Sequence, residues 1–392
     1  MYLSTWILAG QSNMQGFAPL GDPRRAVAVD PRVEVLASSG RWTDAAEPLH
    51  RLWESYTPVH RELERAGLTG EDARLSDGEL ARRQAEGRRV GAGLGPAFAS
   101  RLADATGERV GLIPCAHGGT ALEQWAPGFG GAPVDSLETL YGSMLDRVGR
   151  ARSRAGVAIR GVLWYQGESD ATPVRSADYA ERFDAWVARL RADLGEPELP
   201  VIVVQLGRFA GAVDPGELTE RSWDRIREAQ RRLPRRMRAT AVVSAVDLGL
   251  SDPIHVGAPG LARLGRRMAL LALEHATGPD VERVESLGPG ANGHLVLRVR
   301  CTGVRGGWRE GSHLPGFTLC DADGVAIGRL RVVDAQPDPG DRSSILVVTS
   351  PLDPAELAGV RLSYGQGFDP VCLAVDEADL PLPAFGPQPI ET

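Results

Sequence analysis

Lysine is absent from the sequence, so all 44 basic side chains are arginines. They are scattered along the chain, and the acidic residues outnumber them, which gives a formal net charge of −7. Nucleic-acid-binding domains usually concentrate basic residues in a patch beside a recognisable motif. The charge distribution therefore argues against a nucleic-acid partner, and we interpret the arginine bias as a coding preference rather than a functional feature.

Cysteine is rare: the chain has four, at positions 115, 301, 320 and 372. They form no Cys-x-x-Cys pair and no Cys/His cluster with metal-ligand spacing. Cys115 lies in an apolar stretch, where a thiol packs as a small hydrophobe. The sequence does not reveal whether Cys301 pairs with Cys320, and we expect free buried thiols and no metal site.

Long apolar runs are also missing. A membrane-spanning helix needs roughly 18 or more consecutive apolar residues, and we find no such run, so we expect no membrane partner. We recognise no signal peptide, since the chain begins almost directly with a strand-like segment. We therefore expect a cytoplasmic protein, unless a leader has been removed. The length of 392 residues and the 43% hydrophobic content suit a globular protein with room for two domains.

Residues 3–9 are an apolar run that predicts a buried strand, and the run ends at Gly10. Ser12 and Asn13 follow, where an open α/β sheet would present them at the carboxyl edge that binds ligands. Ser12 is therefore a candidate nucleophile; the alternative is that Ser12 or Asn13 only caps a helix. Met14 occupies the place of the second glycine in the Gly-x-Ser-x-Gly elbow, so an α/β-hydrolase is not expected.

Apolar strands alternate with amphipathic helices up to residue 277, a pattern typical of a parallel sheet covered on both faces. The predicted strands are 33–37, 109–116, 158–165, 200–207 and 239–246, and the predicted helices are 94–106, 136–154, 176–194, 219–233 and 260–276. Residues 50–90 differ, because they are rich in Arg and Glu with apolar residues at helical spacing. They predict one or two inserted helices that could shape access to a site.

Residues 278–392 have a different pattern. Short β-like runs at 294–301, 316–320, 325–333, 344–349, 359–364 and 371–375 are separated by turn residues. They predict a small antiparallel β domain, either a sandwich or a partial barrel. This domain could bind sugar or serve structural packing, and we favour packing because no aromatic platform stands out.

Polar residues follow three of the predicted strands, at 10–13, 117–120 and 166–170, and a later loop at 247–259 carries Asp and His. The carboxyl ends of parallel strands meet at one edge of a sheet, so we expect these segments to lie together. Acyl transfer needs a nucleophile, a base, a group that orients the base, and donors for an oxyanion. These four segments contain candidates for each.

His255 is the candidate base, and Asp252 lies close enough in sequence to bond its far imidazole nitrogen. The alternatives are that Asp252 forms an Asx turn and that His255 is an ordinary loop residue. Asp247 and Glu168 are rival acids.

The oxyanion donors could be the Ser12 N–H, an N–H of the Gly118–Gly119 pair and the Gln166 amide. The alternatives are a tight turn at the two glycines and a buried structural hydrogen bond at Gln166. His117 could line the same pocket or act as a structural turn residue.

Four motifs carry a resemblance to a known family: GQSNM at 10–14, HGGTALEQW at 117–125, GVLWYQGESD at 161–170 and SDPIH at 251–255. Together and in this order, they resemble the sialate O-acetylesterase-like group of the SGNH hydrolase superfamily, which includes acetylxylan esterases. The stretch 360–385 resembles the β segment that closes many of these proteins. The insertion at 50–90 is longer than the family leads us to expect.

The resemblance implies a three-layer α/β/α, flavodoxin-like fold for residues 1–277. It implies that Ser12 is the nucleophile, that Asp252 and His255 complete a triad, and that Gly119 lends its N–H to the oxyanion hole. Gln166 would replace the Asn that helps to name the superfamily. The implied reaction removes acetyl groups from sugar hydroxyls through an acyl-serine, without a metal or other cofactor.

We therefore expect a carbohydrate O-acetylesterase acting on a small-molecule or oligosaccharide ester. We expect four residues to contact the substrate: Gln11, Gly118, Trp125 and Glu168. Trp125 and the insertion would form the sugar subsite. The alternatives are another acyl-ester or thioester hydrolase on the same scaffold, and a non-catalytic carbohydrate-binding protein. The sequence does not determine the sugar, the acetylated position or the oligomeric state.

Overall fold

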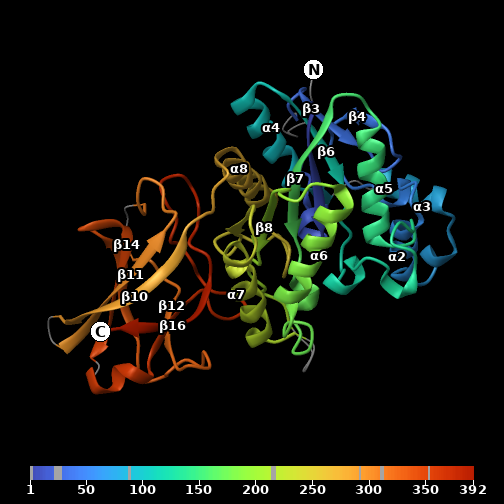
Figure 1. Ribbon diagram of the computed structural model, residues 1–392. Coiled ribbons are helices and arrows are strands. Elements are labelled where there is room, and N and C mark those ends of the chain that lie inside the picture. The colour runs from blue at the N-terminus through green and yellow to red at the C-terminus, as the bar shows by residue number, and fades with distance from the viewer. Residues whose placement is uncertain are drawn as a thin grey trace.

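The computed structural model describes residues 3–21, 29–86, 90–212, 218–290, 293–309, 313–351 and 354–392 (Figure 1). Two seven-stranded sheets organise the chain. The strands of the first end before residue 245, and those of the second begin at residue 280. Within the described residues, we find no helix with the length and apolar character needed to cross a membrane.

The first sheet is built around β1 (Leu3–Gly10), and every residue of this strand is buried. The strand order is β4-β3-β6-β1-β7-β8-β9, and all neighbours are parallel except the edge pair β3–β4. The other strands are β3 (Val33–Leu36), β4 (Trp42–Asp44), β6 (Arg109–Pro114), β7 (Val157–Tyr165), β8 (Val201–Gln205) and β9 (Thr240–Ser244). The predicted parallel sheet is confirmed.

Helices cover both faces of this sheet. α4 and α8 pack against each other on one face, and α5, α6 and α7 lie on the other (Figure 1). These helices are α4 (Gly95–Thr106), α5 (Leu140–Arg152), α6 (Tyr179–Leu194), α7 (Glu220–Arg236) and α8 (Ala258–Glu274). The result is the predicted α/β/α arrangement of three layers.

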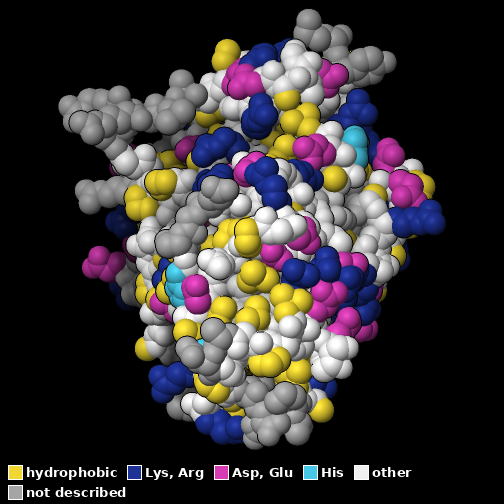
Figure 2. All heavy atoms as spheres, turned by 90° about the vertical axis from the view of Figure 1, so that its left-hand side faces the viewer, with side chains coloured by type: hydrophobic (Ala, Val, Ile, Leu, Met, Phe, Trp, Pro, Cys, Tyr) yellow, Lys and Arg dark blue, Asp and Glu magenta, His cyan; other side chains and the backbone are white. Residues whose placement is uncertain are grey.

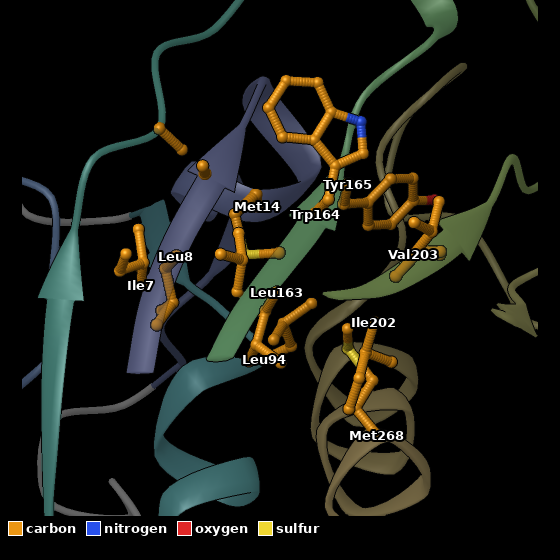
Figure 3. Close-up of a cluster of buried hydrophobic side chains, with 14 of the residues drawn as sticks. Ile7, Leu8, Met14, Leu94, Leu163, Trp164, Tyr165, Ile202, Val203 and Met268 are labelled. Atoms are coloured by element: carbon orange, nitrogen blue, oxygen red, sulfur yellow. The ribbon is translucent and has the colours of Figure 1, made fainter. Parts of the chain in front are cut away.

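The core of this domain lies between the sheet and the helices. Figure 3 shows Leu8, Leu163 and Ile202 from three neighbouring strands near Leu94, just before α4, and Met268 of α8. The three strand residues are register partners, so they share one face of the sheet. Burying each such side chain stabilises the fold by about 1.5–3 kcal/mol.

The segment predicted as a helical insertion contains α2 (Pro58–Ala66) and α3 (Asp77–Glu86). It leads into β5 (Val90–Ala92), which pairs with β2 (Ala18–Pro19) in a two-stranded antiparallel sheet. Through this pairing, the insertion is joined to a segment that lies only a few residues after Ser12 in the sequence.

The second sheet has the order β12-β15-β16-β10-β11-β14-β13. Its strands are β10 (Asp280–Pro289), β11 (His294–Thr302), β12 (Phe317–Cys320), β13 (Val332–Asp338), β14 (Asp341–Pro351), β15 (Arg361–Tyr364) and β16 (Phe385–Glu391). Its pairs are antiparallel except β10–β16. The end strands β12 and β13 approach each other, so the sheet curls into a partial barrel.

Two predicted strands of this domain are wrong. Of the predicted strand 325–333, only residues 332 and 333 lie in a strand, β13, and Ala326 makes an isolated bridge with Cys320. Residues 371–375 form no strand and make only an isolated bridge between Val375 and Pro381. All four cysteines are buried and free, as predicted. Seen from the side of the second sheet, arginines and carboxylates intersperse with apolar side chains over the surface (Figure 2).

Candidate active site

Ser12 begins the short helix α1 (Ser12–Gln15), directly beyond the end of β1. The turn requires glycine at position 10, because its φ is +129° and a Cβ there would lie 2.1 Å from the Tyr165 carbonyl oxygen. The N-cap of α1 is Gln11, and no side chain caps this helix. The capping alternative for Ser12 and Asn13 is therefore not what the structure shows.

Asn13 connects this turn to the loop of His255. Its Oδ1 accepts a hydrogen bond from the Val256 N–H at 3.0 Å, and its Nδ2 donates to the Ile254 carbonyl oxygen at 3.3 Å. These two backbone groups flank His255 on either side. Since Asn13 is the neighbour of Ser12, the contacts bring the predicted nucleophile and the predicted base to one place.

Asp252 orients His255. Its Oδ2 lies 2.7 Å from His255 Nδ1, while its Oδ1 accepts from the N–H groups of Ile254 at 2.9 Å and His255 at 2.8 Å. Partial burial acts to raise the pKa of Asp252, but these hydrogen bonds outweigh it and hold the pKa below its usual value. The residue thus closes an Asx turn and also binds the imidazole.

The rival acids have other partners. The side chain of Asp247 is only 3% exposed and forms a bidentate ion pair with Arg267 of α8, at 2.8 and 2.6 Å. Glu168 accepts a hydrogen bond from Asn13 Nδ2 at 2.8 Å, and burial raises the pKa of its carboxyl group. Asp252 is therefore the acid that holds the His255 ring, and Glu168 acts on the site through Asn13.

The glycine pair after β6 borders Ser12. The Gly118 N–H donates to Gln15 Oε1 at 2.7 Å, and a Cβ at Gly118 would lie 3.5 Å from Ser12 Cβ. Gly119 is exposed, with a φ of +69° and open space where its Cβ would be. Within the described residues, the N–H groups of Ser12 and Gly119 have no hydrogen-bond acceptor, so both are free to bind an oxyanion.

Gln166 does not have the predicted role as an oxyanion donor. Its amide donates one hydrogen bond to Asp170 Oδ2 at 2.6 Å and one to the Thr120 carbonyl oxygen at 3.1 Å. Its Oε1 accepts from the Tyr179 hydroxyl at 3.1 Å. Both amide hydrogens are committed, so Gln166 is the buried tie between two loops that we considered as the alternative.

Three residues expected to contact the substrate are instead buried. Trp125 is fully buried against Trp164, and its indole N–H donates to Thr120 Oγ1 at 3.1 Å. Gln11 accepts from the N–H of Ser169 at 3.2 Å. Glu168 is equally enclosed. Trp125 therefore cannot form a sugar subsite, and of the four predicted contacts only Gly118 is partly open beside Ser12.

Phe17, which belongs to none of the predicted site segments, lies against His255. Its ring stacks on His255 with a centroid distance of 4.7 Å and an interplanar angle of 15°. It is one of the large apolar side chains that stay exposed, at 37%. Its place two residues beyond α1 was visible in the sequence, but its contact with His255, 238 positions later, was not.

The insertion reaches the site through histidines. His60 of α2 contacts His117 with 3.2 Å between their Nδ1 atoms, and the two rings stack. Burial lowers the pKa of His117 to about 4 and holds the pKa of His60 well below its usual value, so both are neutral near pH 7. His117 precedes the glycine pair and is a structural support of that loop. In the described residues, no cluster of three or more His, Cys, Asp or Glu is suited to hold a metal.

The β domain supports the loop of Asp252 and His255 indirectly. The Pro253 carbonyl oxygen accepts from the Ala210 N–H at 2.7 Å. The neighbouring Phe209 N–H donates to the Phe368 carbonyl oxygen at 2.8 Å, and the two phenylalanine rings are 5.2 Å apart. The β domain thus helps to hold the segment that backs Asp252 and His255, which fits the packing role that we favoured for it.

The three-layer fold also occurs in a solved structure. A structure titled as a novel carbohydrate acetylesterase from Xanthomonas citri shares the fold, with a TM-score of 0.65 at 24% identity. That alignment covers 97% of this chain and 80% of the other. The likeness of fold therefore extends over both sheets of this chain.

The family follows from the sequence comparison. The model of the carbohydrate esterase family of sialic acid-specific acetylesterases matches residues 3–274, so the chain belongs to this family of carbohydrate esterases. A probable carbohydrate esterase of Arabidopsis thaliana is 29% identical over 281 residues, which cover 67% of this chain and 88% of that protein. A solved structure from the same plant has a TM-score of 0.51 at 28% identity, covering 70% of this chain and 99% of that one. The predicted resemblance is confirmed.

Proposed function

We propose that this carbohydrate esterase is a serine O-acetylesterase that removes acetyl groups from sugar hydroxyls. The observation that carries the proposal is the position of Asn13, which follows Ser12 and binds the backbone on both sides of His255. Ser12 Oγ attacks the acetyl carbonyl carbon, and His255 Nε2 accepts the hydroxyl proton. Asp252, bound to Nδ1, stabilises the imidazolium that forms.

The negative charge that develops on the carbonyl oxygen needs donors. In the proposal, the N–H groups of Ser12 and Gly119 supply them, and one such donor typically stabilises a transition state by about 3–4 kcal/mol. The imidazolium then protonates the departing sugar oxygen, which leaves acetyl-Ser12. Water attacks this ester with His255 as base, and acetate is released.

Acetate release from glucose pentaacetate, followed by an enzyme-coupled acetate assay, tests this proposal. We expect turnover by the wild type and a loss of at least about 10³-fold for Ser12→Ala, as for other serine hydrolases that lose their nucleophile. Activity on long acyl esters but not on acetates would favour an acyl hydrolase of another kind. Undiminished activity of Ser12→Ala would refute the acyl-serine route.

A further inference from the structure

Phe17 is an exposed aromatic ring that the fold holds beside the base. Gly16 before it has a φ of +96°, and a Cβ there would lie 2.8 Å from the Ala92 carbonyl oxygen. Ala18 after it pairs with Ala92 in the β2–β5 ladder. The backbone is therefore anchored on both sides of Phe17, and the ring position is set in advance rather than left to a free surface side chain.

The Phe17 ring lies close to Ser12, and both are next to Gly118. A Cβ built on Gly118 would lie 3.4 Å from Phe17 Cε2 and 3.5 Å from Ser12 Cβ. One face of the ring lies on His255. Phe17 nevertheless remains 37% exposed, so part of its surface is open to solvent in the neighbourhood of Ser12, Gly118 and His255.

The chemistry of the proposed reaction determines which half of the ester lies there. Asp252 occupies His255 Nδ1, so the opposite nitrogen, Nε2, must give its proton to the departing oxygen. That oxygen must come within hydrogen-bond reach of Nε2. The alcohol half of the ester consequently lies beside the imidazole, and thus beside Phe17, whose centroid is 4.7 Å from that of His255.

We propose that Phe17 is the aromatic surface on which the pyranose ring of the substrate packs, and that it determines the preference for sugar acetates over acyclic ones. The inference rests on the proposed function. The C–H faces of a pyranose are apolar, and covering them with an aromatic ring removes apolar area from water. Phe17 takes the role that the buried Trp125 cannot fill.

The test compares two polyol acetates, the cyclic glucose pentaacetate and the acyclic glyceryl triacetate, in steady-state kinetics. We expect Phe17→Leu to raise the KM for the pentaacetate about five-fold more than the KM for the triacetate, a difference of roughly 1 kcal/mol. Phe17→Tyr retains an aromatic face, so its KM ratio should stay within about two-fold of the wild type. Phe129→Leu, the same change at another exposed phenylalanine (43%), is the matched control.

Equal changes in KM for both esters, or a loss confined to kcat, would overturn the inference, because the ring would then only support His255. Loss of the preference in Phe17→Tyr would also contradict it. Thermal unfolding of each variant separates these results from misfolding. Failure of the wild type to hydrolyse either ester would instead refute the proposed function, and the inference with it, without reference to any Phe17 variant.

Discussion

The side chain of Asn13 holds His255 in place from both sides, through the carbonyl of the residue before it and the N–H of the residue after it. The same amide donates to the buried Glu168. The turn of Ser12 and the loop of His255 are thus joined by one side chain, although they are more than 240 residues apart in the sequence. The position of His255 relative to Ser12 therefore depends on this contact.

Asn13→Ala should therefore impair catalysis while both reacting groups remain. Removing the amide frees the His255 loop, and a small misplacement of a catalytic group can cost about 10²-fold in rate. We expect kcat to fall about 10²-fold and the free energy of unfolding to fall by about 1–3 kcal/mol, because buried partners lose their hydrogen bonds. Steady-state kinetics and urea unfolding measure the two effects. A variant within two-fold of wild-type kcat would show that the contact is not needed.

Glu168→Gln tests the buried carboxyl group. Burial raises the pKa of Glu168 above its unfolded value, so the native state favours the protonated form. The stability contributed by this group is full in acid and is lost as the pH rises through the folded pKa. Glutamine cannot ionise, so the melting temperature of the variant relative to wild type should increase from acid to neutral pH.

The exposed Glu138→Gln provides the matched control for that measurement, and its melting temperature should follow the wild type at each pH. A constant difference between Glu168→Gln and wild type across the pH range would contradict the expectation. It would mean that Glu168 does not change its ionisation on folding.

The pH dependence of stability due to His117 should have the opposite sign to that due to Glu168. His117 should destabilise the protein in acid. Burial lowers its pKa to about 4, whereas an unfolded histidine titrates near 6.5. The unfolded chain therefore binds the proton first, and stability is full above about pH 6.5 and falls by roughly 3 kcal/mol on acidification to pH 4. His117→Gln removes this titration and should reduce the acid loss measured by urea unfolding.

His313→Gln changes an exposed histidine of the β domain and should leave the acid loss unaltered. Equal acid losses in wild type and His117→Gln would rule out His117 as a source of the pH dependence. His60 and Glu64 face His117 from α2, so part of the loss should persist in the variant because His60 is also buried and neutral.

Local patterns were sufficient to predict the sheet and the contact between Asp252 and His255. β1 is a continuous apolar run because both of its faces are covered, and the Asp252–His255 pair is separated by only three residues, so a local turn brings them together. The order of the four motifs along parallel strands predicted that these segments meet at one edge of the sheet. These features depend on short-range chemistry that a sequence displays directly.

The errors concern burial and long-range contact. Trp125 and Gln166 were expected to face the substrate, but their surroundings depend on how two loops pack, and the structure makes them a buried layer behind the site. Phe17 was missed because its partner is His255, and no local pattern distinguishes an exposed phenylalanine at a site from one elsewhere. The His60–His117 contact joins the insertion to the glycine loop for the same long-range reason.

The most direct test of the account is covalent labelling with an aryl fluorophosphonate, which reacts with an activated serine. We expect one adduct per chain by intact mass, mapped to Ser12 by peptide sequencing, with loss of acetate release in proportion to labelling. Ser12→Ala and His255→Ala should not be labelled. Inactivation without modification of Ser12, or labelling at another serine with Ser12 untouched, would contradict the account.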